Sequence, residues 1–347
     1  MIADLVAVFL FIGVIAYSLL GGADFGAGFW DLTAGGAERG RRPRHLIDTS
    51  LGPVWEANHT WLVYCLVFLW TGFPTAFTAI TTTLYLPLGI AALGIVLRGA
   101  GFAFRKATLR TREQRVYGAA FAASSVLTPY CFGSIAGAIA SGRVPTGGDG
   151  DAVGSWLNPT SALGGVLAVL VCAYLAAVYL NAAARQQGAP ALERWFRDRA
   201  LLASVLTGVV SVAGIFVLRQ DAPRLFHQLS HRALALVVLA ALCGLATVLL
   251  LLRDRRTGLR VLATAAVALV VLGWGVAQYP YLLGTHLRID AAASPDATLK
   301  VTIGVAIVAG LLIFPSVGLL LLLAGRGRLR PGAQEDLPGP GPSPRDS

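Results

Sequence analysis

The sequence predicts an all-α integral membrane protein, and three observations support this: composition, apolar runs and the placement of basic residues. Of the 347 residues, 56% are hydrophobic and only 13% are charged, whereas soluble domains carry about 25% charged residues. Apolar runs long enough to cross a bilayer alternate with charged or Gly- and Pro-rich breaks. We therefore expect one membrane domain over residues 1–330 and a disordered tail over 331–347, which is rich in Pro, Gly and charge.

The apolar runs predict nine membrane-spanning helices. The first run lacks a basic leading segment and a small-residue cleavage site, so we expect a retained helix and not a signal peptide. The expected spans lie near residues 4–29, 53–78, 80–104, 116–140, 161–183, 200–218, 233–252, 259–281 and 300–324.

The basic residues predict the orientation of these helices. Most of the 28 lysines and arginines follow the first, third, fifth and seventh spans or lie in the tail. Cytoplasmic loops carry an excess of Lys and Arg, so we expect the N-terminus outside and the C-terminus in the cytoplasm. This arrangement also accounts for the net charge of +10, and we expect no nucleic-acid partner.

Sulfur-containing residues offer little for cofactor binding. The only methionine is the first residue, so no thioether within the chain could ligate a haem. The cysteines stand far apart in apolar runs without a CxxC pair, which favours small buried side chains over a disulfide or a metal site. They are Cys65, Cys131, Cys172 and Cys243.

The first span ends in a glycine-rich segment, 21–30, that contains Asp24. Glycines allow a neighbouring helix to approach closely. Asp24 lies about two helical turns inside the end of this run. It is either a structural hydrogen-bond acceptor or a member of a proton or ion path.

The second span begins with a polar cluster. On a helix, Glu56 and His59 share one face, and a neighbouring face carries Trp55, Asn58 and Trp61. An ionisable group at membrane depth costs about 2.5–3.5 kcal/mol, so such a group usually faces a protein interior or a wet cavity. Glu56 is interpreted as a proton carrier or as a structural carboxylate bonded to the adjacent loop. His59 could be a haem ligand, a proton-relay partner or a packed core histidine.

Two further positions carry interpretable polar residues. Arg98 lies about two turns inside the third span, where it could pair with Asp24 or Glu56, or extend to the membrane surface. Asn158 precedes Pro159 at the start of the fifth span, which is typical of a helix N-cap.

Six segments, taken in order, resemble subunit II of the cytochrome bd-type quinol oxidases, over nearly the whole chain. They are Gly22-Ala-Asp-Phe-Gly-Ala-Gly28, Gly52-Pro-Val-Trp-Glu-Ala-Asn-His-Thr-Trp61, Phe73-Pro74, Leu97-Arg-Gly-Ala-Gly-Phe-Ala-Phe-Arg105, Trp156-Leu-Asn-Pro159 and Ala293-Ser-Pro-Asp-Ala-Thr-Leu299. The resemblance implies two four-helix bundles plus one peripheral helix, in a multi-pass protein of the bacterial cell membrane.

The resemblance also implies an enzyme complex. Its holoenzyme oxidises membrane quinol and reduces O2 to water, with two b-type haems and one d-type haem in subunit I. This chain would then bind no haem and would pack against that haem-bearing partner, where O2 reacts. Some family members hold a structural quinone in subunit II, and small single-helix subunits are a further class of partner.

Site residues carry over by position. The family's proton-path acid, in a Pro-x-Trp-Asp-Gly-Asn pattern, falls on Glu56, so the acid here is one methylene longer and Ala57 replaces the glycine. Asp24 and Arg98 match the family's aspartate and arginine. The resemblance thus implies a cytoplasmic proton path through Glu56 and Asp24.

Two other classes of function compete with this interpretation. In a proton- or cation-coupled transporter, the same acids would bind the ion, and broken helices in paired repeats would be expected. In a purely structural membrane scaffold, the acids would be buried as paired groups.

Overall fold

The computed structural model is almost entirely helical. It describes the backbone of residues 1–36, 38–51, 55–107, 111–255 and 257–325, and their side chains except at 51, 55–57, 102–107, 111–117 and 313–325. The chain divides into two units, Met1–Leu299 and Lys300–Ser347. In the second unit, the described residues form most of one apolar helix.

Helices account for nearly all described residues. They are α1 (Ile2–Leu32), α2 (Arg41–Leu51), α3 (Trp55–Gly72), α4 (Pro74–Thr83), α5 (Tyr85–Ala107), α6 (Thr111–Ala140), α7 (Pro159–Gln186), α8 (Pro190–Asp221), α9 (Pro223–His231), α10 (Leu234–Leu252), α11 (Leu259–Gln278), α12 (Ile289–Ala292) and α13 (Asp296–Gly325). One antiparallel hairpin, β1 (Tyr281–Leu283) with β2 (Leu287–Arg288), precedes α12.

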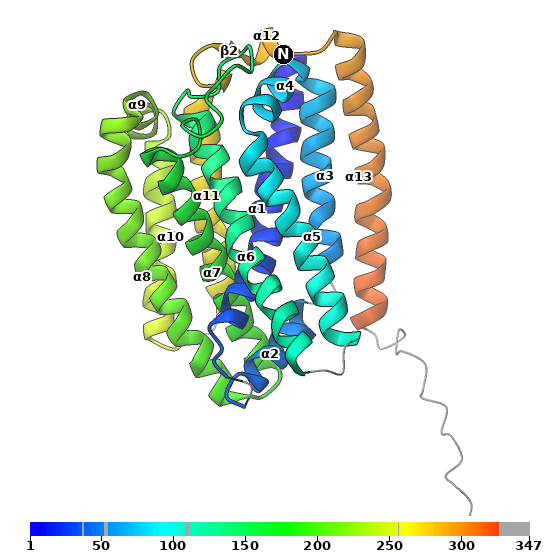
Figure 1. Cartoon of the computed structure of the whole chain (residues 1–347), viewed down its shortest axis with the longest axis vertical. Coiled ribbons are helices and arrows are strands. Elements are labelled where there is room, and N and C mark those ends of the chain that lie inside the picture. Colours follow the sequence, from blue (N-terminus) through cyan, green and yellow to red (C-terminus); the bar gives the residue numbers. More distant parts are fainter. Residues whose placement is uncertain (37, 52–54, 108–110, 256, 326–347) are drawn as a thin grey trace, which may run out of the picture. The chain divides into compact units, whose positions relative to one another are not determined.

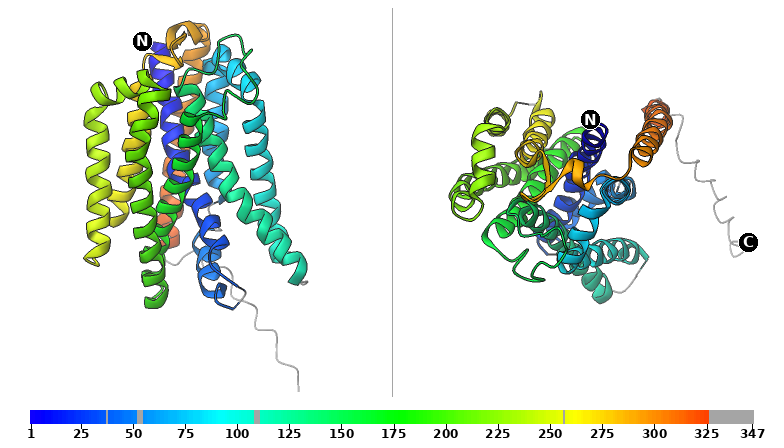
Figure 2. Two further views of the ribbon diagram at one scale, coloured as in Figure 1. Left: turned by 60° about the vertical axis from the view of Figure 1, so that its left-hand side comes forward. Right: turned by 90° about the horizontal axis from the view of Figure 1, so that it is seen from above.

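Helix α1 is the central element of the first unit, in contact with α3, α6, α7 and α11 (Figures 1 and 2). Its glycines explain how closely α7 approaches: a Cβ at Gly26 would overlap the backbone carbonyl of Cys172. Nearby, the Trp30 indole N–H donates a 2.7 Å hydrogen bond to the Ala173 carbonyl. These contacts fix α1 against the middle of α7, within a largely alanine- and leucine-lined core.

The predicted continuous span 53–78 is wrong in its second part. Helix α3 ends at Gly72, and α4 continues from Pro74 at an angle of 118°. The residue before a proline is disfavoured in the helical conformation, and Phe73 has φ −137° and ψ 63°. Ser294 completes the end of α3, with its N–H on the Gly72 carbonyl and its hydroxyl on the Thr71 carbonyl.

Polar side chains fix the start of α7, which is the end far from α2. The predicted N-cap is present: the Asn158 side chain accepts a 2.9 Å hydrogen bond from the Ser161 N–H. Asp221, the last residue of α8, accepts from the Thr160 N–H and hydroxyl. The same carboxylate accepts two hydrogen bonds from Arg143, at 2.6 and 3.0 Å. One aspartate thereby joins the end of α8 to the start of α7 and to the loop that follows α6.

The described helices agree with an integral membrane protein. Six of them are long and apolar enough to cross a bilayer, and the bent pair α3–α4 would make a seventh span within the described residues. The count of nine spans stays a prediction, as do the domain limits 1–330 and 331–347. Helix α8 begins at Pro190 and not near residue 200, because polar first turns extend the helix beyond its apolar run.

Candidate functional site

A buried ion pair joins α1 and α5 in the interior of the first unit. Arg98 and Asp24 are each only 3% exposed. The guanidinium donates to both carboxylate oxygens, with Nη2–Oδ1 at 2.8 Å and Nε–Oδ2 at 3.2 Å. Nη2 also donates to the Asp24 backbone carbonyl at 2.7 Å. Arg98 therefore pairs with Asp24, which is one of the alternatives raised by the sequence. The alternative that its side chain extends to the membrane surface is wrong.

Helix α6 completes the surroundings of the guanidinium. Arg98 Nη1 donates to the Ser125 hydroxyl, which itself donates to the Phe121 carbonyl at 2.6 Å. The guanidinium carbon lies 4.4 Å from the Phe121 ring centre and 5.2 Å from that of Phe25. Cation–π contacts of this kind favour a desolvated cation. The arginine is thus held by a carboxylate, a hydroxyl and two aromatic rings.

Gly28 makes this arrangement possible. It lies one helical turn after Asp24, and a Cβ built there would overlap the Ser125 side chain and Arg98 Nη1. Only glycine leaves room for the guanidinium between α1 and α6. The glycine-rich end of the first span therefore serves the buried pair as well as helix packing.

A second polar contact lies two turns earlier on α1. The Tyr17 hydroxyl is 3.4 Å from His59 Nδ1 on α3. The His59 ring centre lies 6.1 Å from that of Tyr17 and 5.9 Å from that of Phe25. Phe25 thus contacts both the Arg98 guanidinium and the His59 ring, and it connects the two polar groups.

The remaining predicted site residues fall in three classes. Glu56 and Trp55 lie in α3, but their side chains are outside the described residues. Asn58 is buried, and the Trp61 ring packs edge-on against Tyr64. Asn158 caps α7 and is not part of this cluster.

Sequence reasoning missed Tyr17, Phe121 and Ser125. A serine or an aromatic residue in an apolar run is common, so neither carries a signal by itself. The one available hint is the pair Ser124-Ser125, since two adjacent hydroxyls in the middle of a span are unusual in an otherwise apolar run.

Among the described residues of this cluster, His59 supplies an imidazole whose Nδ1 contacts the Tyr17 hydroxyl and whose ring lies beside those of Tyr17 and Phe25. No group of three or more His, Cys, Asp or Glu side chains in the described part of the chain could hold a metal ion. What the cluster offers is charge and hydrogen bonding at membrane depth.

Comparisons with known proteins agree on one family. Residues 2–323 match the family described as cytochrome bd terminal oxidase subunit II. A Bacillus subtilis protein named cytochrome bd ubiquinol oxidase subunit 2 is 30% identical over 171 residues. That alignment covers 48% of this chain and 48% of the relative, so the chain spans about half the length of that relative.

A solved structure extends the likeness to the whole fold. It is the bd oxidase from Geobacillus thermodenitrificans, which shares 27% sequence identity and a TM-score of 0.73. The match covers 93% of this chain and 98% of the other. Several of its helices are apolar and long enough to span a membrane, so the protein is a multi-pass bacterial membrane protein. The chain belongs to the cytochrome bd terminal oxidase subunit II family.

Proposed function

We propose that this chain is subunit II of a cytochrome bd-type terminal oxidase, which oxidises membrane quinol and reduces O2 to water. The observation that carries the proposal is the family match over residues 2–323. Membership of this family supports placing two b-type haems and one d-type haem in a partner, subunit I. In this arrangement the chain supplies packing surface and acidic side chains, and electron transfer belongs to the partner.

Within the complex, Glu56 and Asp24 contribute a proton path from the cytoplasm. The Asp24 carboxylate is charge-balanced by a two-point contact with Arg98, so both of its oxygens are already engaged. Glu56 is therefore the proton carrier, and the Asp24–Arg98 pair fixes a polar environment for protons and water.

His59 is the partner that helical periodicity assigns to Glu56. The two residues are three positions apart on α3, which places them on one face. Since His59 contacts Tyr17 and Phe25 of α1, that face of α3 is turned toward α1. The polar groups of α1, α3 and α5 then form one cluster.

The full architecture has nine spans in two four-helix bundles plus a peripheral helix, with the N-terminus outside and the C-terminus in the cytoplasm. The alternation of basic loops supports this orientation. Quinol and O2 bind the complex and not this chain alone. A structural quinone and small single-helix subunits are compatible additions to it.

The substitution Glu56→Gln in the purified complex tests the proton role. We expect the haem absorbance per complex to persist, while quinol-driven O2 uptake falls by about tenfold or more, as for loss of a proton-transfer group. Glu56→Asp is the matched control, since it keeps the carboxyl group, and it should retain most of the activity. Normal uptake by Glu56→Gln with intact haems would leave only a structural role for this residue.

The transporter alternative receives less support. Its expected feature is a pair of matched helix breaks, and the described part of the chain has one bent pair, α3–α4. Purification in mild detergent separates the two functions. An oxidase subunit should retain a stoichiometric haem-bearing partner, whereas a transporter should not.

A further inference from the structure

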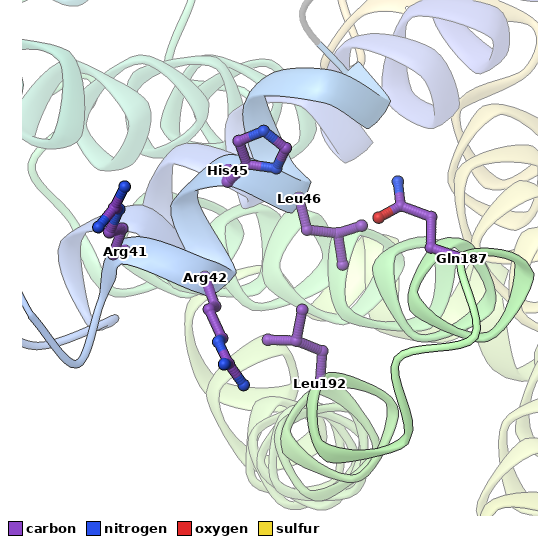
Figure 3. A pocket seen from close by; sticks show the side chains of 6 residues that line it. All are labelled: Arg41, Arg42, His45, Leu46, Gln187 and Leu192. Carbon is purple, nitrogen blue, oxygen red and sulfur yellow. The ribbon is translucent and has the colours of Figure 1, made fainter.

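A cationic pocket lies between α2 and the turn that connects α7 with α8. Its volume is about 290 Å³, and Arg41, Arg42, His45, Leu46, Gln187 and Leu192 line it. Figure 3 shows Arg41, Arg42 and His45 of α2 on one side of the pocket, and Gln187 and Leu192 on the other. This pocket lies apart from the Asp24–Arg98 pair, in which none of its residues takes part.

Helix α2 is held rigidly, so the pocket is preformed. Leu46 and Ile47 are only 1% and 3% exposed and belong to the core of the first unit. Arg44 Nε donates to Asp31 Oδ1 at 2.7 Å, and its Nη2 donates to the Gly35 carbonyl at 2.6 Å. One arginine of α2 is therefore used to fix the helix to the end of α1.

The pocket arginines are in a different situation. Arg41 and Arg42 are exposed, and no described carboxylate forms an ion pair with either of them. The neighbouring Arg44 and Arg185, in contrast, are paired with Asp31 and Glu193. The pocket thus keeps two uncompensated positive charges over an apolar floor formed by Leu46 and Leu192.

The position of the pocket identifies its occupant. Helices α1 and α7 end and α8 begins around it, and all three are candidate membrane spans. The apolar run of α7 ends just before Gln187, so the pocket lies on the headgroup side of the hydrocarbon of a bilayer. Guanidinium groups bind phosphate oxygens through paired, charge-assisted hydrogen bonds, and an imidazole and a carboxamide N–H add further donors.

We propose that this pocket binds the phosphate of an anionic phospholipid headgroup. The basic side chains select a phosphate-bearing anion, and the location selects a lipid over a free ion. The bound lipid joins α2 to the α7–α8 turn, so it stabilises this end of the helix bundle. The proposal does not depend on the oxidase function.

The test uses the full chain in its purified, delipidated complex. Native mass spectrometry counts the lipid bound during titration with phosphatidylglycerol and, separately, with phosphatidylcholine. Inorganic phosphate is added as a competitor. The variant Arg41→Gln/Arg42→Gln removes the pocket charges. The matched control Arg253→Gln/Arg255→Gln removes two exposed charges just beyond the end of α10. This end of α10 lies near the first turns of α8, because Arg197 of α8 donates a hydrogen bond to the Leu251 carbonyl.

We expect the pocket variant to bind phosphatidylglycerol about tenfold or more weakly, from the loss of two interfacial arginines. The control should change binding by about twofold or less, because its charges act only through a screened field. Both variants should unfold at nearly the parental temperature, since the altered side chains are exposed. Equal losses in the two variants, equal affinity for phosphatidylcholine, or occupation by inorganic phosphate without any lipid preference would overturn the proposal.

Discussion

Asp24 and Arg98 stabilise the protein only as a pair. Each side chain is almost completely buried among apolar helices, where a single unpaired charge is unfavourable. Together they form a neutral unit whose donors and acceptors are satisfied by Ser125 and by the Asp24 carbonyl. Removing one partner from such a pair costs about 3–5 kcal/mol, whereas removing both is often close to neutral.

A double-mutant cycle of Asp24 and Arg98 should therefore give a coupling free energy that favours the pair. Asp24→Asn and Arg98→Met should each lower the free energy of unfolding by about 3–5 kcal/mol. The double variant should lose clearly less than the sum of the two single losses. Denaturant unfolding of the purified complex measures all four proteins, and additive losses would contradict a direct pair.

Gly28→Ala tests the space beside Arg98. The new methyl group would overlap Ser125 and the guanidinium, and such overpacking costs about 1–3 kcal/mol. The control is Gly208→Ala in α8, where a Cβ meets no atom within 4 Å. That change should be neutral or stabilise by up to about 1 kcal/mol, because alanine favours a helix over glycine. Equal thermal unfolding temperatures for the two variants would exclude the proposed crowding.

At this scale the sequence predicted the charged residues and named Asp24 as one possible partner of Arg98, but it left the choice open. An ionisable residue in an apolar run is conspicuous, so Asp24, Glu56 and Arg98 could be chosen directly. The pairing of Arg98 with Asp24 depends on how α1 and α5 are rotated about their axes, which hydropathy does not encode. Ser125 was missed for the same reason, since its role exists only beside the guanidinium.

The helices themselves show where sequence patterns succeed and fail. Apolar runs located the long helices, because burial in lipid or in a bundle requires the same composition. The break at Phe73-Pro74 was missed, because hydropathy does not register the backbone restriction that a proline imposes on its neighbour. Helix α2 was also missed, because it is short and basic. Its place depends on Arg44 and two buried side chains, whose contacts only the structure reveals.

Asp221 provides a prediction for helix ends. Its carboxylate accepts hydrogen bonds from Arg143 and from the first turn of α7, so Asp221→Ala should destabilise the protein by about 1–3 kcal/mol. Asp290→Ala is the control, because its ion pair with Arg288 is exposed. Exposed pairs contribute about 0–1 kcal/mol. Similar unfolding temperatures for the two variants would mean that Asp221 does not join the helix ends.

At the scale of the whole molecule, each loop must be assigned to one side of the membrane. Helix α7 is a candidate span, and its two flanking segments, 141–158 and 187–189, lie at opposite ends of it. The first carries Arg143 alone among basic residues, whereas Arg185 and several arginines of α8 surround the second. The charge rule then places the first segment outside and the second in the cytoplasm.

Cysteine labelling of intact cells tests this orientation. Thr146 and Gln186 are both exposed and lie at opposite ends of α7, so each accepts a cysteine without disturbing the core. A membrane-impermeant maleimide should label Thr146→Cys in intact cells, and Gln186→Cys only after the membrane is opened. The parental chain, whose four cysteines are all partly or fully buried, gives the background. Labelling in the reverse order would invert the membrane topology and would move the start of α3, with Glu56, to the outer face, where it could not receive protons from the cytoplasm.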